Sequence, residues 1–120
     1  MTGVQTCALP ISIYSDDGRF IKTNICRARL SNAGLGGANL ELAILDDSDL
    51  SGANLVGTNL KGASLFKVDL TGADLRQTIL TSADLKGAKL DRADLTGAIL
   101  TDTKDIPISK EEAKRRGAIV

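Results

Sequence analysis

The stretch that decides the fold runs from Ser51 to Leu100 and reads SGANLVGTNLKGASLFKVDLTGADLRQTILTSADLKGAKLDRADLTGAIL. Every block of five residues in it ends on an apolar residue, which we call the centre of the block. The same spacing extends outward over residues 18–102, where seventeen consecutive centres run from Phe20 to Leu100. Two positions before each centre stands a small residue, which is Ala in eleven of the seventeen blocks. The chain therefore carries an internal repeat with a period of five residues.

A period of five excludes a helical repeat. In a helix, residues two positions apart point about 200° from each other, so the small residue and the centre could not share a face. In an extended strand, residues two apart lie on the same side. Each block is therefore predicted to be a short extended piece whose small residue and centre both face inward, followed by a corner.

The corners have their own sequence signature. Gly stands two positions after the centre in seven blocks, as expected where a tight turn needs a positive φ angle. These glycines are Gly37, Gly52, Gly57, Gly62, Gly72, Gly87 and Gly97. Asp or Asn directly precedes the centre in nine blocks, and such side chains can bond backbone amides at turns.

Four right-angle corners would close one coil of twenty residues, with successive coils stacked about 4.8 Å apart. At a spacing of twenty, five outward pairs have opposite charge and two have like charge, whereas a spacing of fifteen gives three and two. Opposite charges side by side stabilise neighbouring strands, so the charges favour the four-sided coil. The five pairs are Arg27 with Asp47, Asp47 with Lys67, Arg29 with Asp49, Asp69 with Lys89, and Glu41 with Lys61.

The repeats resemble the pentapeptide-repeat family, whose pattern is A(D/N)Lxx. The resemblance implies an all-β fold, a right-handed quadrilateral β-helix, and seventeen blocks would fill about four coils. The small inner position departs from Ala in six blocks, which leaves the regularity of the coil open there. These departures are Gly18, Thr23, Ser48, Thr58, Val68 and Thr78.

Residues 103–120 are predicted to form a C-terminal cap, because the repeat fails where Asp105 occupies a centre position. A short helix is expected over residues 110–116. Ser109 and Glu112 have the spacing of a capping box, and Gly117 is placed to end the helix. Its basic last turn, residues 114–116, suggests a nucleic-acid patch, but we favour an ordinary solvated helix end.

Residues 1–17 share nothing with the repeat and are predicted to be non-native or disordered. The order of residues 1–11 resembles a translated sequencing adapter, so we expect the chain to be an N-terminally truncated fragment. No cap is legible at this end, which would leave Phe20 and Ile25 in an exposed first layer. We therefore expect self-association through the uncapped N-terminal coil.

The composition argues against catalysis and against direct nucleic-acid binding. The chain has no His to act as a base near neutral pH, and its 15 basic and 15 acidic residues give no net charge. No catalytic residue, cofactor or metal site is predicted, and two Cys without His cannot complete a tetrahedral metal site. Cys26 falls at an outward position and is interpreted as an incidental surface residue rather than a reactive thiol. No membrane span is predicted, and we expect a cytoplasmic protein.

The favoured function is a non-enzymatic scaffold or protein-interaction module with a protein partner that the sequence does not identify. Leu42, Ile44 and Phe66 are predicted to lie near one corner as a partner-binding patch. The alternative is a DNA-mimicking protein that binds a topoisomerase, a role that the resemblance implies because some family members protect or inhibit gyrase. A column formed by Asn54, Asp74 and Asp94 favours that alternative, whereas the neutral net charge argues against it.

Overall fold

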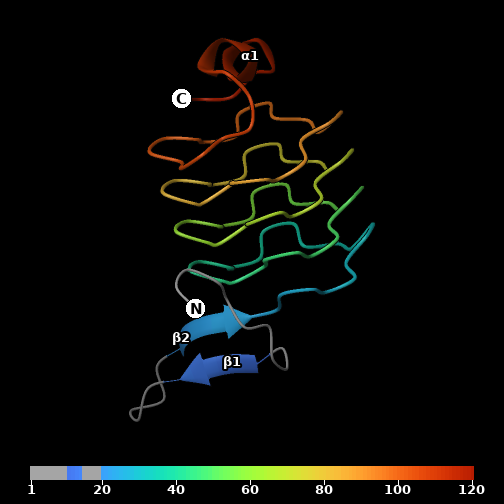
Figure 1. The fold of residues 1–120 in the computed structure, drawn as a ribbon, viewed down its shortest axis with the longest axis vertical. Coiled ribbons are helices and arrows are strands. Elements are labelled where there is room, and N and C mark those ends of the chain that lie inside the picture. The colour runs from blue at the N-terminus through green and yellow to red at the C-terminus, as the bar shows by residue number, and fades with distance from the viewer. Residues whose placement is uncertain (1–10, 15–19) are drawn as a thin grey trace.

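The computed structural model describes residues 11–14 and 20–120 (Figure 1). Two strands, β1 (Ile11–Tyr14) and β2 (Phe20–Asn24), form an antiparallel pair at one end of a stack of coils. One helix, α1 (Lys110–Arg115), lies at the other end. Within the described residues, no helix is long and apolar enough to cross a bilayer.

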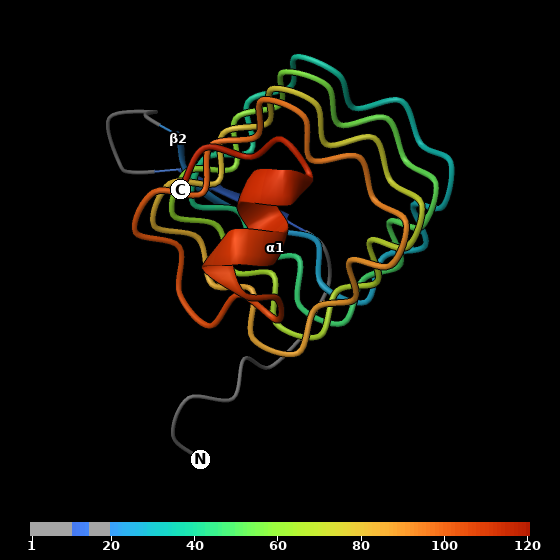
Figure 2. The ribbon, with the colours of Figure 1, turned by 90° about the horizontal axis from the view of Figure 1, so that it is seen from above.

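The stack is built from parallel backbone bridges, each joining a residue to the one twenty positions later. Arg29 pairs with Asp49, Asp49 with Asp69, and Asp69 with Lys89 in one such column. Figure 2 shows the coil from above as four-sided, with the successive turns superposed. The register confirms the predicted twenty-residue coil.

One hydrogen-bond rule repeats along the stack. The amide of each centre from Ile25 to Leu85 donates to the carbonyl nineteen residues later, as from Leu50 to Asp69 and from Leu55 to Asp74, both at 2.8 Å. The carbonyl of each small inner residue from Thr23 to Ala83 accepts from the amide 21 residues later, as Ala53 does from Asp74 at 2.9 Å. The coils therefore satisfy their backbone groups much as parallel strands do.

The core is the column of centres and small residues along the axis. Every centre from Leu45 to Leu100 is at most 4% exposed, which confirms the predicted inward assignment. Each buried Leu contributes about 1.5–3 kcal/mol to stability. In the first coil, by contrast, Leu30, Leu35 and Leu40 are only half-buried. The apolar layer at the N-terminal end of the stack is therefore incompletely covered.

Hydroxyl residues at the small inner position keep the coil regular. Thr58 donates from its Oγ1 to the carbonyl of Leu35 at 2.7 Å, and Ser48 donates from its Oγ to the carbonyl of Ile25 at 2.9 Å. Val68 is fully buried at the same kind of position. These departures from Ala therefore fit the core without leaving a buried polar side-chain atom unsatisfied in the described part of the chain.

The second position after the centre has a positive φ angle in every block from Arg27 to Asp102. The seven predicted corner glycines have φ between 66° and 74°, which confirms their role. Nine other residues, among them Leu42 and Gln77, adopt the same left-handed conformation despite its steric cost. The fold thus imposes the left-handed conformation at every corner, and glycine only lowers its steric cost.

Helix α1 is one residue shorter than predicted, and Arg116 is its C-terminal cap residue. The Ser109 hydroxyl accepts from the amide of Glu112 at 3.1 Å, which confirms half of the capping box. The carboxylate of Glu112 contacts Arg115 instead of reaching back. Gly117 follows with φ of 88°, as expected for a residue that ends a helix.

β1 pairs with β2 inside the N-terminal segment, and the prediction that residues 1–17 are non-native or disordered stays a prediction. Ile11–Tyr14 lies within the segment predicted to be non-native or disordered, yet its backbone forms an antiparallel ladder with β2 from Ile11–Asn24 to Tyr14–Phe20. The sequence Ile-Ser-Ile-Tyr alternates apolar and polar residues at its start, which is typical of a strand. The rest of residues 1–17 lies outside the described residues, as does the side chain of Phe20.

Candidate functional site

The described part of the chain has no cluster of metal-ligating side chains. Among residues 11–14 and 20–120, no three His, Cys, Asp or Glu side chains gather as a metal site would require. Cys26 is only 5% exposed and is disulfide-bonded. The interpretation of Cys26 as an incidental surface residue is therefore wrong, and a reactive thiol at this position is excluded as well.

The predicted partner-binding patch is only partly present. Leu42 is 53% exposed and Phe66 is half-buried with its ring 5.1 Å from Nζ of Lys67. Ile44, however, is only 4% exposed, so it cannot form part of a contact surface. The prediction that Ile44 is exposed is wrong, and a role for Leu42 and Phe66 in partner binding stays a prediction.

Ile44 is buried at one corner of the first two coils. Its backbone is bridged on both sides, to Asn24 and to Ser64. Asn24, Cys26 and Asp46 at this corner are also at most 8% exposed, although their positions in the repeat are outward. Asp46 is satisfied there, because its Oδ1 accepts from the Ser64 hydroxyl at 2.5 Å and from the Phe66 amide at 3.2 Å.

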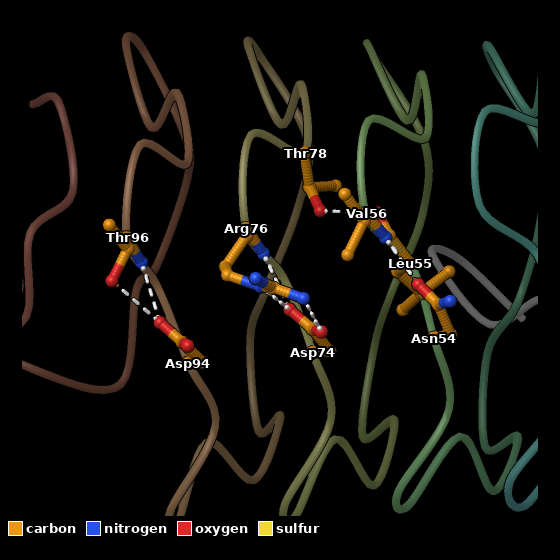
Figure 3. Close-up of polar contacts among 8 residues, drawn as sticks. All are labelled: Asn54, Leu55, Val56, Asp74, Arg76, Thr78, Asp94 and Thr96. Carbon is orange, nitrogen blue, oxygen red and sulfur yellow. Dashed lines mark hydrogen bonds and ion pairs between the residues drawn. The ribbon is translucent and has the colours of Figure 1, made fainter.

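The predicted column of Asn54, Asp74 and Asp94 is a continuous backbone ladder (Figure 3). In each block the side-chain Oδ1 accepts from the amide two residues later: Val56 at 3.0 Å, Arg76 at 3.2 Å and Thr96 at 3.0 Å. This Asx-type bond confirms that Asp and Asn before the centre support the turn locally. The column therefore has a structural role in shaping the corners.

The charge of this column is partly compensated. The guanidinium of Arg76 forms two hydrogen bonds with the Asp74 carboxylate, at 2.8 Å and 2.7 Å, and holds the pKa of Asp74 below its ordinary value. The hydroxyl of Thr96 bonds Asp94 at 2.7 Å and lowers the pKa of Asp94, although the nearby Asp74 carboxylate opposes that shift. The column thus presents the amide of Asn54, the ion pair of Asp74 with Arg76, and the Asp94 carboxylate that Thr96 hydrogen-bonds, not a run of negative charge.

A second column was missed by sequence reasoning. Ile79, Ile99 and Ile119 occupy outward positions of one face and are bridged in succession, and we call them the isoleucine column. Ile119 is 54% exposed and Val120 is 37% exposed, while Ile79 and Ile99 are half-buried. The signal was present in the sequence, because these residues are spaced by twenty and stand where most blocks carry Asp or Asn.

Solved structures similar to this chain are pentapeptide-repeat proteins. Rfr23 from the cyanobacterium Cyanothece is 32% identical over 74% of this chain and 67% of its own, with a TM-score of 0.47. HetL from the cyanobacterium Nostoc, involved in regulating heterocyst differentiation, is 35% identical over 75% of this chain, with a TM-score of 0.44. The chain spans only 40% of HetL. QnrB1, a plasmid-mediated fluoroquinolone resistance protein, is 17% identical over 88% of this chain and 59% of its own, with a TM-score of 0.36.

The sequence comparison decides the family. A search of curated protein sequences gives no match. The profile of pentapeptide repeats, however, matches with eight copies over residues 23–62, 43–81 and 63–102, which together span two thirds of the chain. The chain belongs to the pentapeptide-repeat family, and its fold is the right-handed quadrilateral β-helix of that family.

Proposed function

We propose that this protein is a non-enzymatic scaffold or protein-interaction module that binds a partner through a flat outer face of its β-helix. The observation that carries the proposal is the isoleucine column. Ile79, Ile99 and Ile119 stand in line on one face, at positions that carry polar side chains in most other blocks. Exposed apolar groups gathered on one face of a solenoid mark a surface for partner binding.

The surroundings of the isoleucine column support this proposal. Residues 78–82 contain no charged residue, and among the equivalent residues 98–102 of the next coil only Asp102 is charged. Thr81, Ser82 and Thr101 flank the column and are at least partly exposed. An apolar centre with a largely uncharged polar rim resembles the composition of protein interfaces more than that of a general surface.

Substitution of the column tests the proposal. Ile99→Lys places a charge in the middle of the column, and Asn59→Lys places the same charge on the same face, two coils earlier. Lys89 shows that a lysine is accepted at this position of the repeat. We expect proteins retained by the immobilised wild-type chain to be lost with Ile99→Lys and kept with Asn59→Lys. Equal retention by both variants would exclude the isoleucine column as the contact.

Leu42 and Phe66 form a second candidate contact near another corner. The side chain of Leu42 lies against Gly62 at the corner of the next coil. A Cβ added to Gly62 would lie 2.7 Å from Cδ2 of Leu42. Because the Leu42 side chain is exposed, packing inside the fold does not explain why a leucine occupies this corner. Leu42→Ser in the same retention assay separates this contact from the isoleucine column, because only the partner that uses Leu42 would be lost.

The alternative function, DNA mimicry toward a topoisomerase, has weaker support. It rests on the column of Asn54, Asp74 and Asp94, whose charge is reduced by the Arg76 ion pair. The chain as a whole has no net negative charge. We expect no protection of gyrase in a supercoiling assay with added quinolone over a wide concentration range. Protection that is lost with Asp94→Lys would instead support the alternative.

We also propose that α1 caps a stack of about four coils, while the N-terminal coil self-associates. The half-buried Leu30, Leu35 and Leu40 support the second part, because an apolar layer open to water favours association. Leu35→Lys should reduce the apparent mass in size-exclusion chromatography at high concentration. A wild-type chain that is strictly monomeric at every concentration would contradict self-association.

A further inference from the structure

In most blocks of the coil a side-chain oxygen caps the turn. In all nine described blocks where Asp or Asn precedes the centre, its Oδ1 accepts from the amide two residues later, at 2.9–3.2 Å. A hydroxyl at that second residue donates to the same oxygen, from Ser51 to Asp49 at 2.6 Å and from Thr96 to Asp94 at 2.7 Å. The turn thus offers two donors, an amide and a hydroxyl, that together bind one carboxylate oxygen.

Two blocks of the isoleucine column keep these donors but lack the acceptor. Thr81 follows Ile79, and Thr101 follows Ile99, at the same spacing as Thr96 follows Asp94. Within the part of the chain that the structure describes, neither the amide nor the hydroxyl of these two threonines has an acceptor. Both residues are at least partly exposed. Four donors on two neighbouring coils are therefore open to an acceptor from outside the chain.

The charges around these donors favour an anion at Thr81. Lys61 is exposed, stands one coil before Thr81 in the same column, and forms no ion pair within the described residues. The two coils lie side by side here, because the amide of Gly62 donates to the carbonyl of Thr81 at 2.9 Å. On the next coil, Asp102 directly follows Thr101 and repels an anion there. A carboxylate is therefore attracted more to Thr81 than to Thr101.

We propose that the partner of the isoleucine column is a peptide segment in which an acidic side chain stands between apolar ones. Its carboxylate accepts from the amide and hydroxyl of Thr81, and its apolar side chains pack on Ile79 and Ile99. This assignment rests on the proposed function, because it gives the chemistry of the partner that binds the same face. A wholly apolar partner would bury the donors of Thr81 without an acceptor, which is unfavourable. The partner's carboxylate takes the place that Asp94 takes beside Thr96.

Three blocked tripeptides test this partner chemistry against the isotope-labelled full chain, followed through its amide resonances by NMR. Leu-Asp-Leu carries the proposed groups, Leu-Asn-Leu has the same shape without the charge, and Ala-Asp-Ala lacks the large apolar side chains. We expect Leu-Asp-Leu to shift the amide resonance of Thr81. It should bind about ten-fold more tightly than Leu-Asn-Leu, since hydrogen bonds to a charged acceptor are roughly twice as strong as neutral ones. It should also bind more tightly than Ala-Asp-Ala.

A variant that fills the donors from within the chain gives the second test. Ile79→Asp supplies a carboxylate to Thr81, as Asp94 does to Thr96, and should abolish the shift that Leu-Asp-Leu causes. Asn59→Asp is the matched control, because it adds the same charge to the same face one coil earlier and leaves Thr81 unchanged. It should bind Leu-Asp-Leu as wild type does. If the spectrum of Ile79→Asp shows an unfolded chain, Thr81→Val decides, since it removes the hydroxyl donor and should reduce the preference for Leu-Asp-Leu over Leu-Asn-Leu.

The inferred partner chemistry is overturned if no peptide shifts the Thr81 resonance, or if Leu-Asp-Leu binds no more tightly than either of the other peptides. Undiminished binding of Leu-Asp-Leu to a folded Ile79→Asp would overturn it as well, as would an unchanged preference in Thr81→Val where that variant decides. These outcomes leave the proposed function standing, because retention of a partner by wild type and its loss with Ile99→Lys are measured separately. Loss of the partner with Ile99→Lys, combined with equal binding of Leu-Asp-Leu and Leu-Asn-Leu, would uphold the proposed function alone.

Discussion

The hydroxyl of Thr78 donates a 2.7 Å hydrogen bond to the carbonyl oxygen of Leu55, which lies 23 residues earlier in the chain. That carbonyl also accepts from the amide of Thr58 at 3.0 Å. The side chain at the small inner position therefore uses the second lone pair of a centre carbonyl that would otherwise have one partner. The same bond recurs from Thr103 to Leu80 at 2.8 Å, so threonine at this position links neighbouring coils.

Thr78→Val should lower the free energy of unfolding by about 1 kcal/mol, the net value of one such hydrogen bond. Valine has nearly the volume of threonine, and the fully buried Val68 shows that it fits the same position. The loss is therefore ascribed to the bond and not to packing. Urea denaturation measures it, and Thr101→Val on the exposed surface is the control. Equal midpoints for the two variants would contradict this account.

Leu70→Asp should abolish folding, because Leu70 is fully buried on the axis and an aspartate there has no partner for its charge. Asp91→Ala removes an exposed side chain and should change stability by less than about 0.5 kcal/mol. Thermal unfolding followed by circular dichroism compares the two variants. The inward assignment of the centres is incorrect if both melt at the wild-type temperature.

The sequence was sufficient for the architecture because one physical constraint repeats in every block. Each inward pair of a small residue and a centre must fit the same narrow core, so the five-residue period and the twenty-residue coil could both be predicted. The glycine corners could be predicted for the same reason. Corners occupied by other residues, such as Leu42, could be predicted only because they stand at multiples of five residues from those glycines.

The outward surface was predicted less well, because no repeated constraint acts on it. Ile44 has the position of an exposed residue and is buried by its local surroundings, which the repeat does not encode. The isoleucine column was missed since each of its members looks like an isolated departure until residues are aligned at a spacing of twenty. Arg116 was interpreted as a solvated helix end, because the carbonyls of Leu90 and Ala93, which accept from its Nη2, lie more than twenty residues away in sequence.

Gly57→Ala should destabilise the chain by about 1–2 kcal/mol, the steric cost of a left-handed conformation with a Cβ. Gly57 has φ of 67°, and a Cβ there would meet no atom within 4 Å, so the cost is conformational and not a clash. Gly34→Ala is the matched control. Its φ is not in the left-handed range and its Cβ would also meet nothing, so it should be neutral or stabilising by about 0.4–1 kcal/mol. Equal effects of the two substitutions on the urea midpoint would contradict the corner assignment.

Asp94→Asn should weaken the dependence of stability on acid. The Thr96 hydroxyl and amide bond the carboxylate and hold the pKa of Asp94 below its ordinary value. A group whose pKa is lower in the folded state stabilises the fold above its unfolded pKa of about 3.9 and loses that contribution as the pH falls through the folded value. Asparagine keeps the turn bond, as Asn54 does with the Val56 amide at 3.0 Å, but it does not titrate. Urea midpoints at neutral pH and at about pH 3 should therefore differ less for Asp94→Asn than for wild type.

Asp91→Asn removes an exposed carboxylate elsewhere on the coil and controls for the change in net charge. If Asp91→Asn reduces the difference between the two midpoints as much as Asp94→Asn does, the Thr96 bonds are not the cause.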